Sequence, residues 1–215
     1  MAIPEDGPFD VAAVCGWGVM WGGGTVLNRG GSRRGDRVGI GGLGGVGTSA
    51  VVGAALAGAG SIIAIDRDEN RLKAAARLGA TYAISNADGM AAQRIIELSG
   101  GGVDLAFETA GTLGAFETAY GAVRRGGTVV SVGLVDPKTP FALDIAGLVT
   151  GAKTVKGSYM GSCNPALDIP KYVELYTGGH FPVQKLISHH LPLGEINSAL
   201  DRMAGNQALR QNVEP

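Results

Sequence analysis

The chain has 215 residues, of which 37 are glycine and 45% are hydrophobic, and its formal net charge is −1. Glycine is far above its usual share of roughly 7%, but it does not recur at every third position as collagen requires. The hydrophobic content excludes a disordered chain, and the near-neutral charge gives no support for a nucleic acid or a membrane as partner. We therefore expect a folded protein that uses glycine for close packing and tight turns.

Cysteine content and the N-terminal residues bear on the cellular compartment. Cys15 and Cys163 are too few for a disulfide framework in a chain of this size. The first ten residues carry three acidic and no basic side chain, unlike a secretory signal. We therefore expect a cytoplasmic protein.

One uncharged run, residues 38–65, is as long as a membrane span. Its glycines, including those in Gly58-Ala59-Gly60, would interrupt a membrane helix. A buried strand, a turn, a helix and a second strand explain the same run better, so we expect no membrane segment there.

Strand-like and helix-like patterns alternate from residue 37 onward. Short apolar runs predict strands, and runs with helical spacing predict the helices between them. Strands in such an alternation pair in parallel, and their continuous apolar character predicts that both faces are covered. The sequence therefore predicts an α/β fold with a doubly wound parallel sheet and helices on both faces. The expected strands are 37–40, 61–65, 81–84, 103–107 and 128–132, and the expected helices are 46–57, 68–78, 89–98 and 113–123.

The two flanks differ from this central part. Residues 1–36 contain a glycine-rich stretch with Trp17 and Trp21, followed by a basic turn. After residue 160, the patterns predict a helix at 166–176, an apolar stretch at 186–193 and a last helix at 194–203. These pieces are too few to make a second domain by themselves.

A glycine-rich loop follows the first predicted strand. Residues 42–47 read Gly-Leu-Gly-Gly-Val-Gly, a helix begins inside this loop, and Asp66 ends the next strand about 20 residues later. This combination is typical of a dinucleotide-binding Rossmann fold. Gly42 permits the tight turn, Gly44 lets the backbone approach a pyrophosphate, and Gly47 lets the helix pack closely on the strand. The N–H groups at the helix start favour a bound phosphate.

Asp66 is placed to accept hydrogen bonds from ribose hydroxyls, which favours NAD over NADP because a carboxylate repels a 2′-phosphate. Arg67 and Arg71 could instead receive that phosphate, so the preference stays open. Asp66 could also be only a helix N-cap or a turn residue. Two weaker interpretations of the loop are a methyltransferase that uses S-adenosylmethionine and a merely compact strand-to-helix turn.

Short motifs then point to one family. In order, they are Ile3-Pro4-Glu5-Asp6, Gly35-Asp36-Arg37-Val38, the loop at 42–47, Ala57-Gly58-Ala59, Leu78-Gly79-Ala80-Thr81, Val103-Asp104, Glu108-Thr109-Ala110-Gly111, Arg125-Gly126-Gly127, Lys156-Gly157-Ser158 and Ile196-Asn197. Through their order and spacing, the chain resembles the zinc-dependent alcohol dehydrogenases of the medium-chain dehydrogenase family. The resemblance covers nearly the whole chain but only the C-terminal, NAD-binding portion of such an enzyme.

The resemblance implies which residues would bind NAD. It places the pyrophosphate at Gly44, Gly45 and Val46, in the loop that Gly42 and Gly47 complete, and the adenosine ribose between Asp66 and Arg71. The remaining implied residues are Thr109 and Ala110 in the cleft, Val132, Gly133 and Leu134 on the nicotinamide side, Ser158 and Met160 beside the carboxamide, and Arg210 near the pyrophosphate. For three of these the sequence fits a structural role equally well: Val132 and Met160 as core residues, and Arg210 as a surface charge.

The sequence departs from the family where zinc would bind. The N-terminal catalytic domain that the resemblance implies is missing, and with it most zinc ligands and the proton relay. Alignment on neighbouring glycines places Trp17 at a remaining cysteine ligand and Trp21 at a threonine. Cys15 could replace that ligand in a shifted alignment, and otherwise it is a small buried residue. The three histidines, His180, His189 and His190, lack ligand spacing. The sequence therefore predicts no metal ligand and no catalytic residue.

These observations predict the cofactor half of an NAD-dependent oxidoreductase that transfers hydride between an alcohol or aldehyde and NAD. The isolated chain is expected to be inactive, and the alternative is a non-enzymatic or degenerate NAD-binding module from a truncated gene. The expected domains are 18–160 for NAD binding, with 1–17 and 161–215 as remnants of a catalytic domain. The family also implies a homodimer through the sheet edge at 140–143, and we expect exposed apolar surface near Trp17 and Trp21.

Overall fold

A computed structural model describes residues 7–205 and 207–214, so the motif Ile3-Pro4-Glu5-Asp6 lies outside the described residues. At its centre is a parallel sheet with the order β3-β2-β1-β4-β5-β6. The order reverses between β1 and β4, which is the switch point where α/β sheets bind ligands. The predicted doubly wound sheet is confirmed. Its strands are β1 (Arg37–Gly41), β2 (Ser61–Asp66), β3 (Tyr82–Ser85), β4 (Val103–Glu108), β5 (Val123–Ser131) and β6 (Thr154–Gly157).

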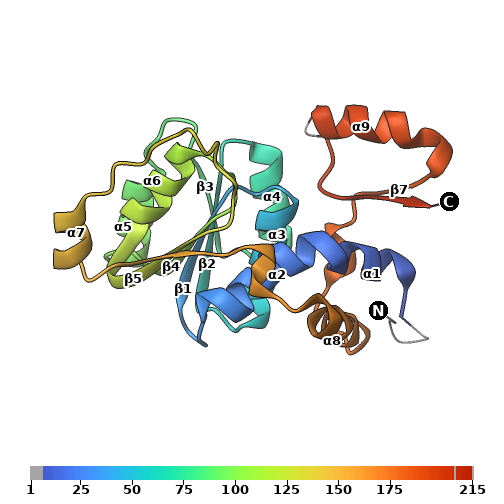
Figure 1. Cartoon of the computed structure of the whole chain (residues 1–215), viewed down its shortest axis with the longest axis horizontal. Helices are drawn as coiled ribbons and strands as arrows, with labels where there is room; N and C mark the ends of the chain where they lie inside the picture. The colour runs from blue at the N-terminus through green and yellow to red at the C-terminus, as the bar shows by residue number, and fades with distance from the viewer. Residues whose placement is uncertain (1–6, 206, 215) are drawn as a thin grey trace.

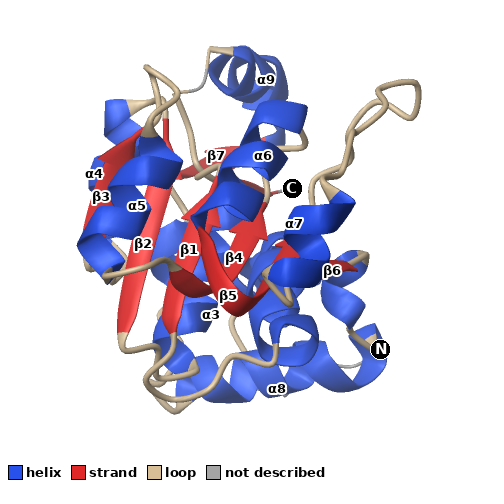
Figure 2. Ribbon diagram, turned by 90° about the vertical axis from the view of Figure 1, so that its left-hand side faces the viewer, coloured by secondary structure: helices blue, strands red, loops and turns tan. Residues whose placement is uncertain are grey.

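Helices cover both faces of this sheet (Figure 2). Helices α3 (Gly45–Leu56) and α4 (Glu69–Arg77) pack on one face, and α5 (Ala91–Ser99) and α6 (Leu113–Ala122) pack on the other. Strand β2 shows why both faces are needed. Ile62 and Ala64 belong to the first core, whereas Ile63 and Ile65 belong to the second, because successive side chains of a strand point to opposite faces.

The glycine-rich N-terminal flank is helical, which the sequence patterns did not predict. Helix α1 (Phe9–Val14) continues through a wider turn at Cys15–Val19 into α2 (Met20–Gly24) and on to Gly30. Glycine disfavours helices, but here it permits contact with α3. A Cβ on Gly22 would meet the carbonyl of Val46, and one on Gly53 would lie 2.8 Å from the Cα of Gly23. The expected domain boundary after residue 17 falls inside this helical segment, and the division into domains stays a prediction.

The remaining elements lie after β5. Helix α7 (Ile145–Thr150) precedes the edge strand β6, and neither was expected from the sequence patterns. Helix α8 (Pro165–Thr177) and helix α9 (Ile196–Ala204) match expected helices. Strands β7 (His189–Pro192) and β8 (Gln211–Glu214) form a separate parallel pair, and Figure 1 shows α7 and α9 at opposite ends of the molecule.

The uncharged run 38–65 forms β1, α3 and β2, as the strand–helix–strand interpretation predicted. Among the described residues, no helix has the length and apolar character needed to cross a membrane.

Candidate functional site

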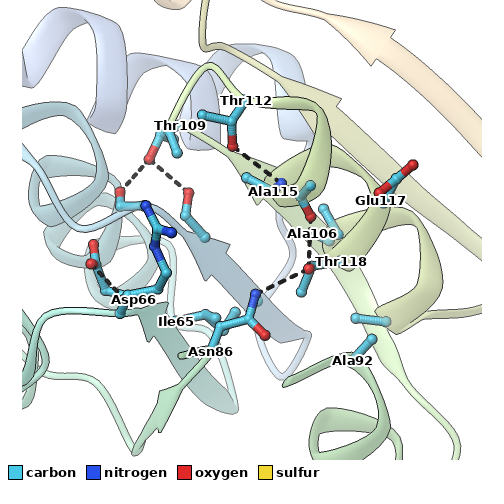
Figure 3. Close-up of a pocket in the computed structure, with 18 of the residues that line it drawn as sticks. Ile65, Asp66, Asn86, Ala92, Ala106, Thr109, Thr112, Ala115, Glu117 and Thr118 are labelled. Carbon is cyan, nitrogen blue, oxygen red and sulfur yellow. Dashed lines mark hydrogen bonds between the residues drawn. The ribbon is translucent and has the colours of Figure 1, made fainter. Parts of the chain in front are cut away.

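A cavity of about 1010 Å³ opens at the carboxyl ends of the parallel strands (Figure 3). It begins at the glycine loop after β1 and extends past Asp66 to the wall formed by α6. A hydrogen bond of 3.2 Å from Asn86 Nδ2 to Thr118 Oγ1 spans the far part of the cavity. Six of the predicted cofactor residues line it: Gly42, Gly44, Asp66, Arg71, Thr109 and Ala110.

Three glycines of the loop differ in what a side chain at their position would meet. Gly42 has a φ of +89°, and a Cβ there would lie 2.7 Å from the backbone nitrogen of Ala110. A Cβ on Gly47 would meet the carbonyl oxygen of Gly42, so only glycine lets α3 start this close to β1. A Cβ on Gly44 would meet nothing within 4 Å. The loop therefore faces open space at Gly44, directly before the first residue of α3.

Thr109, directly after β4, connects that strand to the glycine loop through hydrogen bonds. Its hydroxyl donates to the carbonyl oxygens of Gly41 at 3.0 Å and Gly42 at 2.5 Å. Its backbone N–H donates to Gly41 at 2.9 Å. These bonds hold β1 and β4 together at the switch point, so the loop has a fixed position on the floor of the cavity.

Asp66 links the end of β2 to the same loop. Its Oδ2 accepts from the Leu43 N–H at 2.6 Å, and its Oδ1 accepts from the N–H groups of Arg67 at 2.7 Å and Asp68 at 3.0 Å. Asp68, whose side chain accepts from Asn70 and Arg71, is the N-cap of α4. The N-cap interpretation of Asp66 is therefore wrong. Its carboxylate lines the cavity and lies 3.8 Å from the Arg71 guanidinium.

Arg210 reaches the phosphate loop from the C-terminal flank. A Cβ on Gly18 or on Gly45 would meet its guanidinium, so the side chain lies between these two segments. Burial lowers the pKa of Arg210, and its Nε has no hydrogen-bond partner among the described residues. Arg210 is thus a half-buried cation beside the start of α3, where an anion would complement it.

The residues expected on the nicotinamide side lie apart from the cavity lining. Val132 and Ser158 are buried, whereas Leu134 is exposed. Gly133 crosses close to Gly111, and a Cβ there would meet the backbone of Gly111. Gly45, Val46, Gly47, Met160 and Arg210 are also absent from the lining of this cavity, although Gly45 and Arg210 touch each other.

Glu108 is a residue that the sequence analysis did not select. Its side chain is fully buried at the end of β4. One carboxylate oxygen accepts from the N–H groups of Ala110 at 2.7 Å and Gly111 at 2.6 Å, and the other accepts from the Ser131 hydroxyl at 3.1 Å. Glu108 therefore joins the turn that lines the cavity to the end of β5. The sequence shows only that an acid ends a largely apolar strand, which does not identify the groups that it binds.

The residues present do not fit a catalytic zinc site. Burial raises the pKa of the Cys15 thiol to about 12, whereas zinc binds the thiolate. Trp17, at the position expected for a cysteine ligand, has no ligating atom. His189 hydrogen-bonds to the adjacent Ser188, and His190 hydrogen-bonds to Glu214 on the paired strand β8. Within 7–205 and 207–214, no three metal-ligating side chains cluster.

Comparisons with known proteins agree with this architecture. A family model described as "Zinc-binding dehydrogenase" matches residues 45–178. The NDMA-dependent alcohol dehydrogenase of Amycolatopsis methanolica is 36% identical over 94% of this chain and 56% of its own length. Alcohol dehydrogenase 2 of Zea mays is 34% identical over 97% of this chain and 55% of its own length.

Solved structures give the same result. An alcohol dehydrogenase zinc-binding domain protein from Burkholderia ambifaria superposes with a TM-score of 0.94 at 33% identity, over 99% of this chain and 57% of that one. Benzyl alcohol dehydrogenase from Acinetobacter calcoaceticus also has a TM-score of 0.94, at 30% identity, over 99% of this chain and 59% of that one.

The chain belongs to the zinc-binding dehydrogenase family and is a homologue of alcohol dehydrogenases. This result disfavours the methyltransferase interpretation of the glycine loop. The chain spans only about half the length of the curated relatives that it matches.

Proposed function

We propose that the chain binds NAD in the cavity at the carboxyl ends of β1, β2 and β4. The observation that carries this proposal is the open position of Gly44 at the start of α3. Free N–H groups and the positive end of the helix dipole meet there, and the Arg210 guanidinium lies against neighbouring Gly45. A pyrophosphate has the charge and the acceptor oxygens that this arrangement requires.

The polar groups of the cavity support positions for the ribose and the adenine of NAD. Asp66 would accept from the ribose hydroxyls, and the elongated part of the cavity toward Asn86 and Thr118 would hold the adenine. When bound, NAD supplies a hydride acceptor. This chain's residues bind and orient it, with Thr109 and Glu108 fixing the backbone that lines the cavity.

Asp66 supports NAD rather than NADP as the preferred cofactor. One of its oxygens already accepts from Leu43, which holds the carboxylate at the cavity wall. A 2′-phosphate would be repelled there. Arg67 and Arg71 also line the cavity, so an Asp66→Ser variant is expected to bind NAD more weakly and NADP more tightly. Titration calorimetry with both cofactors checks this expectation, and an unchanged NAD-to-NADP ratio would contradict it.

We further propose that the chain is the cofactor half of an alcohol dehydrogenase-like oxidoreductase. The second candidate is a non-enzymatic NAD-binding module, and a specific observation favours it for the isolated chain. Trp17 and the buried Cys15 thiol leave zinc without ligands in this segment. An alcohol oxygen would then lack the Lewis acid that zinc provides.

A Gly44→Val variant tests the cofactor site directly. The φ of −71° and ψ of −168° at this residue suit valine, and its side chain would enter open space rather than the core. We expect NAD binding to be lost while the free energy of unfolding changes by no more than about 1 kcal/mol. Calorimetry and urea unfolding measure the two quantities.

Gly194→Val is the matched control, because a Cβ on Gly194 also meets nothing within 4 Å but lies in the C-terminal flank. This control should bind NAD as the unaltered chain does. Equal NAD affinity of the Gly44→Val variant would rule out the proposed position of the pyrophosphate.

We also propose a homodimer that forms through the edge strand β6. The sheet ends at β6, and the neighbouring helix α7 has no buried residue. Ile145, Val149 and Val155 expose large apolar surface at this edge. A second copy would cover that surface and pair the open strand edge. The segment 140–143, where the dimer was expected, is mostly exposed and lies directly before α7.

A further inference from the structure

Arg210 is a cation without an anionic partner, so its position beside the phosphate loop needs support from elsewhere. No carboxylate among the described residues lies within ion-pair distance of its guanidinium, and its buried Nε has no hydrogen-bond partner there. A desolvated cation without a partner favours conformations that return it to water. The chain must therefore hold Arg210 in place through its backbone.

Strands β7 and β8 carry Arg210 to this position. Ser188 directly precedes β7 and Arg210 directly precedes β8, so the two residues lie opposite each other at the start of the parallel pair. Strand β7 contacts α9, and β8 contacts α1 (Figure 1). The Gln211 side chain also donates to the Ala199 carbonyl of α9 at 2.7 Å. Strand β8 is therefore anchored directly after Arg210.

Ser188 binds the backbone at Arg210 and at the residue before it. Its hydroxyl donates to the Arg210 carbonyl at 2.7 Å and accepts from the Leu209 N–H at 3.2 Å, and its own N–H donates to the Arg210 carbonyl at 2.8 Å. A serine hydroxyl donates one hydrogen bond and accepts two. His189 Nδ1, 3.0 Å away, takes the last place as a donor, because the hydroxyl proton is already used. The hydroxyl therefore cannot turn away without losing hydrogen bonds.

We propose that Ser188 is a positioning residue for the cofactor: its hydroxyl fixes the backbone of Arg210 and so holds the guanidinium against Gly45. A pyrophosphate at the loop then meets a cation that is already in place, and binding avoids the entropy cost of ordering a long side chain. The inference rests on the proposed NAD binding. It gives residues 161–215, expected only as a remnant of a catalytic domain, a part in binding the cofactor.

Ser188→Ala tests this role because it removes the hydroxyl and little else. Ser188 is exposed, so the change leaves no cavity in the core, and the backbone N–H can still donate to the Arg210 carbonyl. We expect NAD binding to weaken about fivefold, which corresponds to about one hydrogen bond. Titration calorimetry on the full chain measures the affinity. Ser188→Thr keeps a hydroxyl and should retain the affinity of the unaltered chain.

Ser198→Ala is the matched control. Ser198 lies on α9 in the same flank, is exposed, and its hydroxyl has no hydrogen-bond partner among the described residues. This variant should bind NAD as the unaltered chain does, and urea unfolding checks that all variants are equally folded at the temperature of the titration. An equal loss of NAD affinity in both alanine variants would overturn the positioning role of Ser188.

A double-mutant cycle with Arg210→Met separates positioning from a general structural effect. Arg210→Met by itself is expected to weaken NAD binding about tenfold, because the charge-assisted contact with the pyrophosphate is lost. If Ser188 acts through Arg210, then Ser188→Ala has no further effect once Arg210 is replaced. A fivefold loss in both backgrounds would show that the hydroxyl acts independently of Arg210, and it would overturn the inference.

Two further outcomes distinguish this inference from the proposed function. Unchanged NAD affinity in Ser188→Ala would overturn the positioning role and leave NAD binding at the phosphate loop intact. Failure of the unaltered chain to bind NAD would overturn the proposed function and the positioning role together. The expected result is a loss in Ser188→Ala that Ser188→Thr restores and that disappears when Arg210 is replaced.

Discussion

At the scale of single residues, the candidate site depends on the glycines of the loop and on the buried carboxylate of Glu108. A Cβ has no room at Gly42 or Gly47, whereas it would meet nothing at Gly44. Gly42 and Gly47 are therefore needed for packing within the protein, and Gly44 leaves space for a ligand. The loop could be predicted because its glycines and Asp66 have fixed spacing in the sequence. Glu108 could not, because its role arises only where the turn after β4 and the end of β5 converge on one carboxylate.

Glu108→Leu is expected to lower the free energy of unfolding by about 3–5 kcal/mol, measured by urea unfolding. The change removes the acceptor of three part-buried hydrogen bonds, from the N–H groups of Ala110 and Gly111 and the hydroxyl of Ser131, and leaves a cavity-lining turn without its anchor. Glu108→Gln retains an acceptor oxygen and should cost less, about 1–2 kcal/mol. A leucine variant as stable as the unaltered chain would contradict this role.

Zinc is expected to leave the chain on dialysis against a weak chelator, as measured by elemental analysis. The Cys15 thiol would have to ionise in a buried environment that raises its pKa to about 12, and an indole at Trp17 cannot ligate the metal. Retention of a full zinc equivalent per chain would contradict this expectation and would favour Cys15 as a ligand.

At the scale of elements, strands and helices of the sheet were predictable, and the glycine-rich helix was not. Apolar runs such as Ser61–Asp66 carry their own signal, because both faces are buried. The helix through Gly22 and Gly23 exists because α3 approaches it closely, and this tertiary contact overrides the low helix propensity of glycine. Helix α7 and strand β6 escaped prediction because they are short and largely exposed.

Gly22→Leu is expected to destabilise the chain by about 2–4 kcal/mol, measured by thermal or urea unfolding. Any side chain there must push α2 away from the backbone of Val46 and Ala50 in α3. Gly16→Ala, in the same helical segment but with open space around it, should be neutral or slightly stabilising. Equal stability of the two variants would contradict the close helix contact.

Asp104 joins three strands at the end of the sheet opposite the cavity. It accepts from the Arg37 N–H of β1 at 2.6 Å and pairs with Arg124 of β5 at 2.6 Å. Burial acts to raise the pKa of Asp104, but the Arg37 N–H and the two guanidinium groups outweigh it, so the pKa lies below its ordinary value.

A lowered pKa in the folded state means that the ionised carboxylate stabilises the fold at neutral pH. This contribution is lost as the pH falls below the ordinary value of 3.8 through the folded pKa. Asp104→Asn is therefore expected to cost about 1–3 kcal/mol at neutral pH and progressively less in acid, measured by urea unfolding at several pH values. A pH-independent difference would contradict this ion-pair contribution.

At the scale of the whole molecule, the described residues form a doubly wound parallel sheet with additional elements at both ends. It matches its relatives over nearly its full length but over about half of theirs. Apolar side chains are exposed near α7 and at Trp17, and the proposed association would cover such surface.

Analytical ultracentrifugation is expected to detect a dimer that Val155→Glu converts to a monomer. A two-fold contact through β6 would bring the two introduced carboxylates together, and like charges oppose pairing. Ala76→Glu on α4, at an exposed position away from that edge, adds the same single negative charge and should remain dimeric. A monomer for the unaltered chain at high concentration would contradict the edge-to-edge dimer.

We propose that this chain binds NAD but lacks the groups that oxidise an alcohol, and one experiment tests both parts. The most direct measurement titrates the unaltered chain with NAD by calorimetry and then follows NADH formation with a panel of primary alcohols. We expect saturable binding with a Kd on the order of micromolar and no alcohol-dependent NADH formation. Absence of binding heat, or turnover accompanied by a full equivalent of bound zinc, would contradict it.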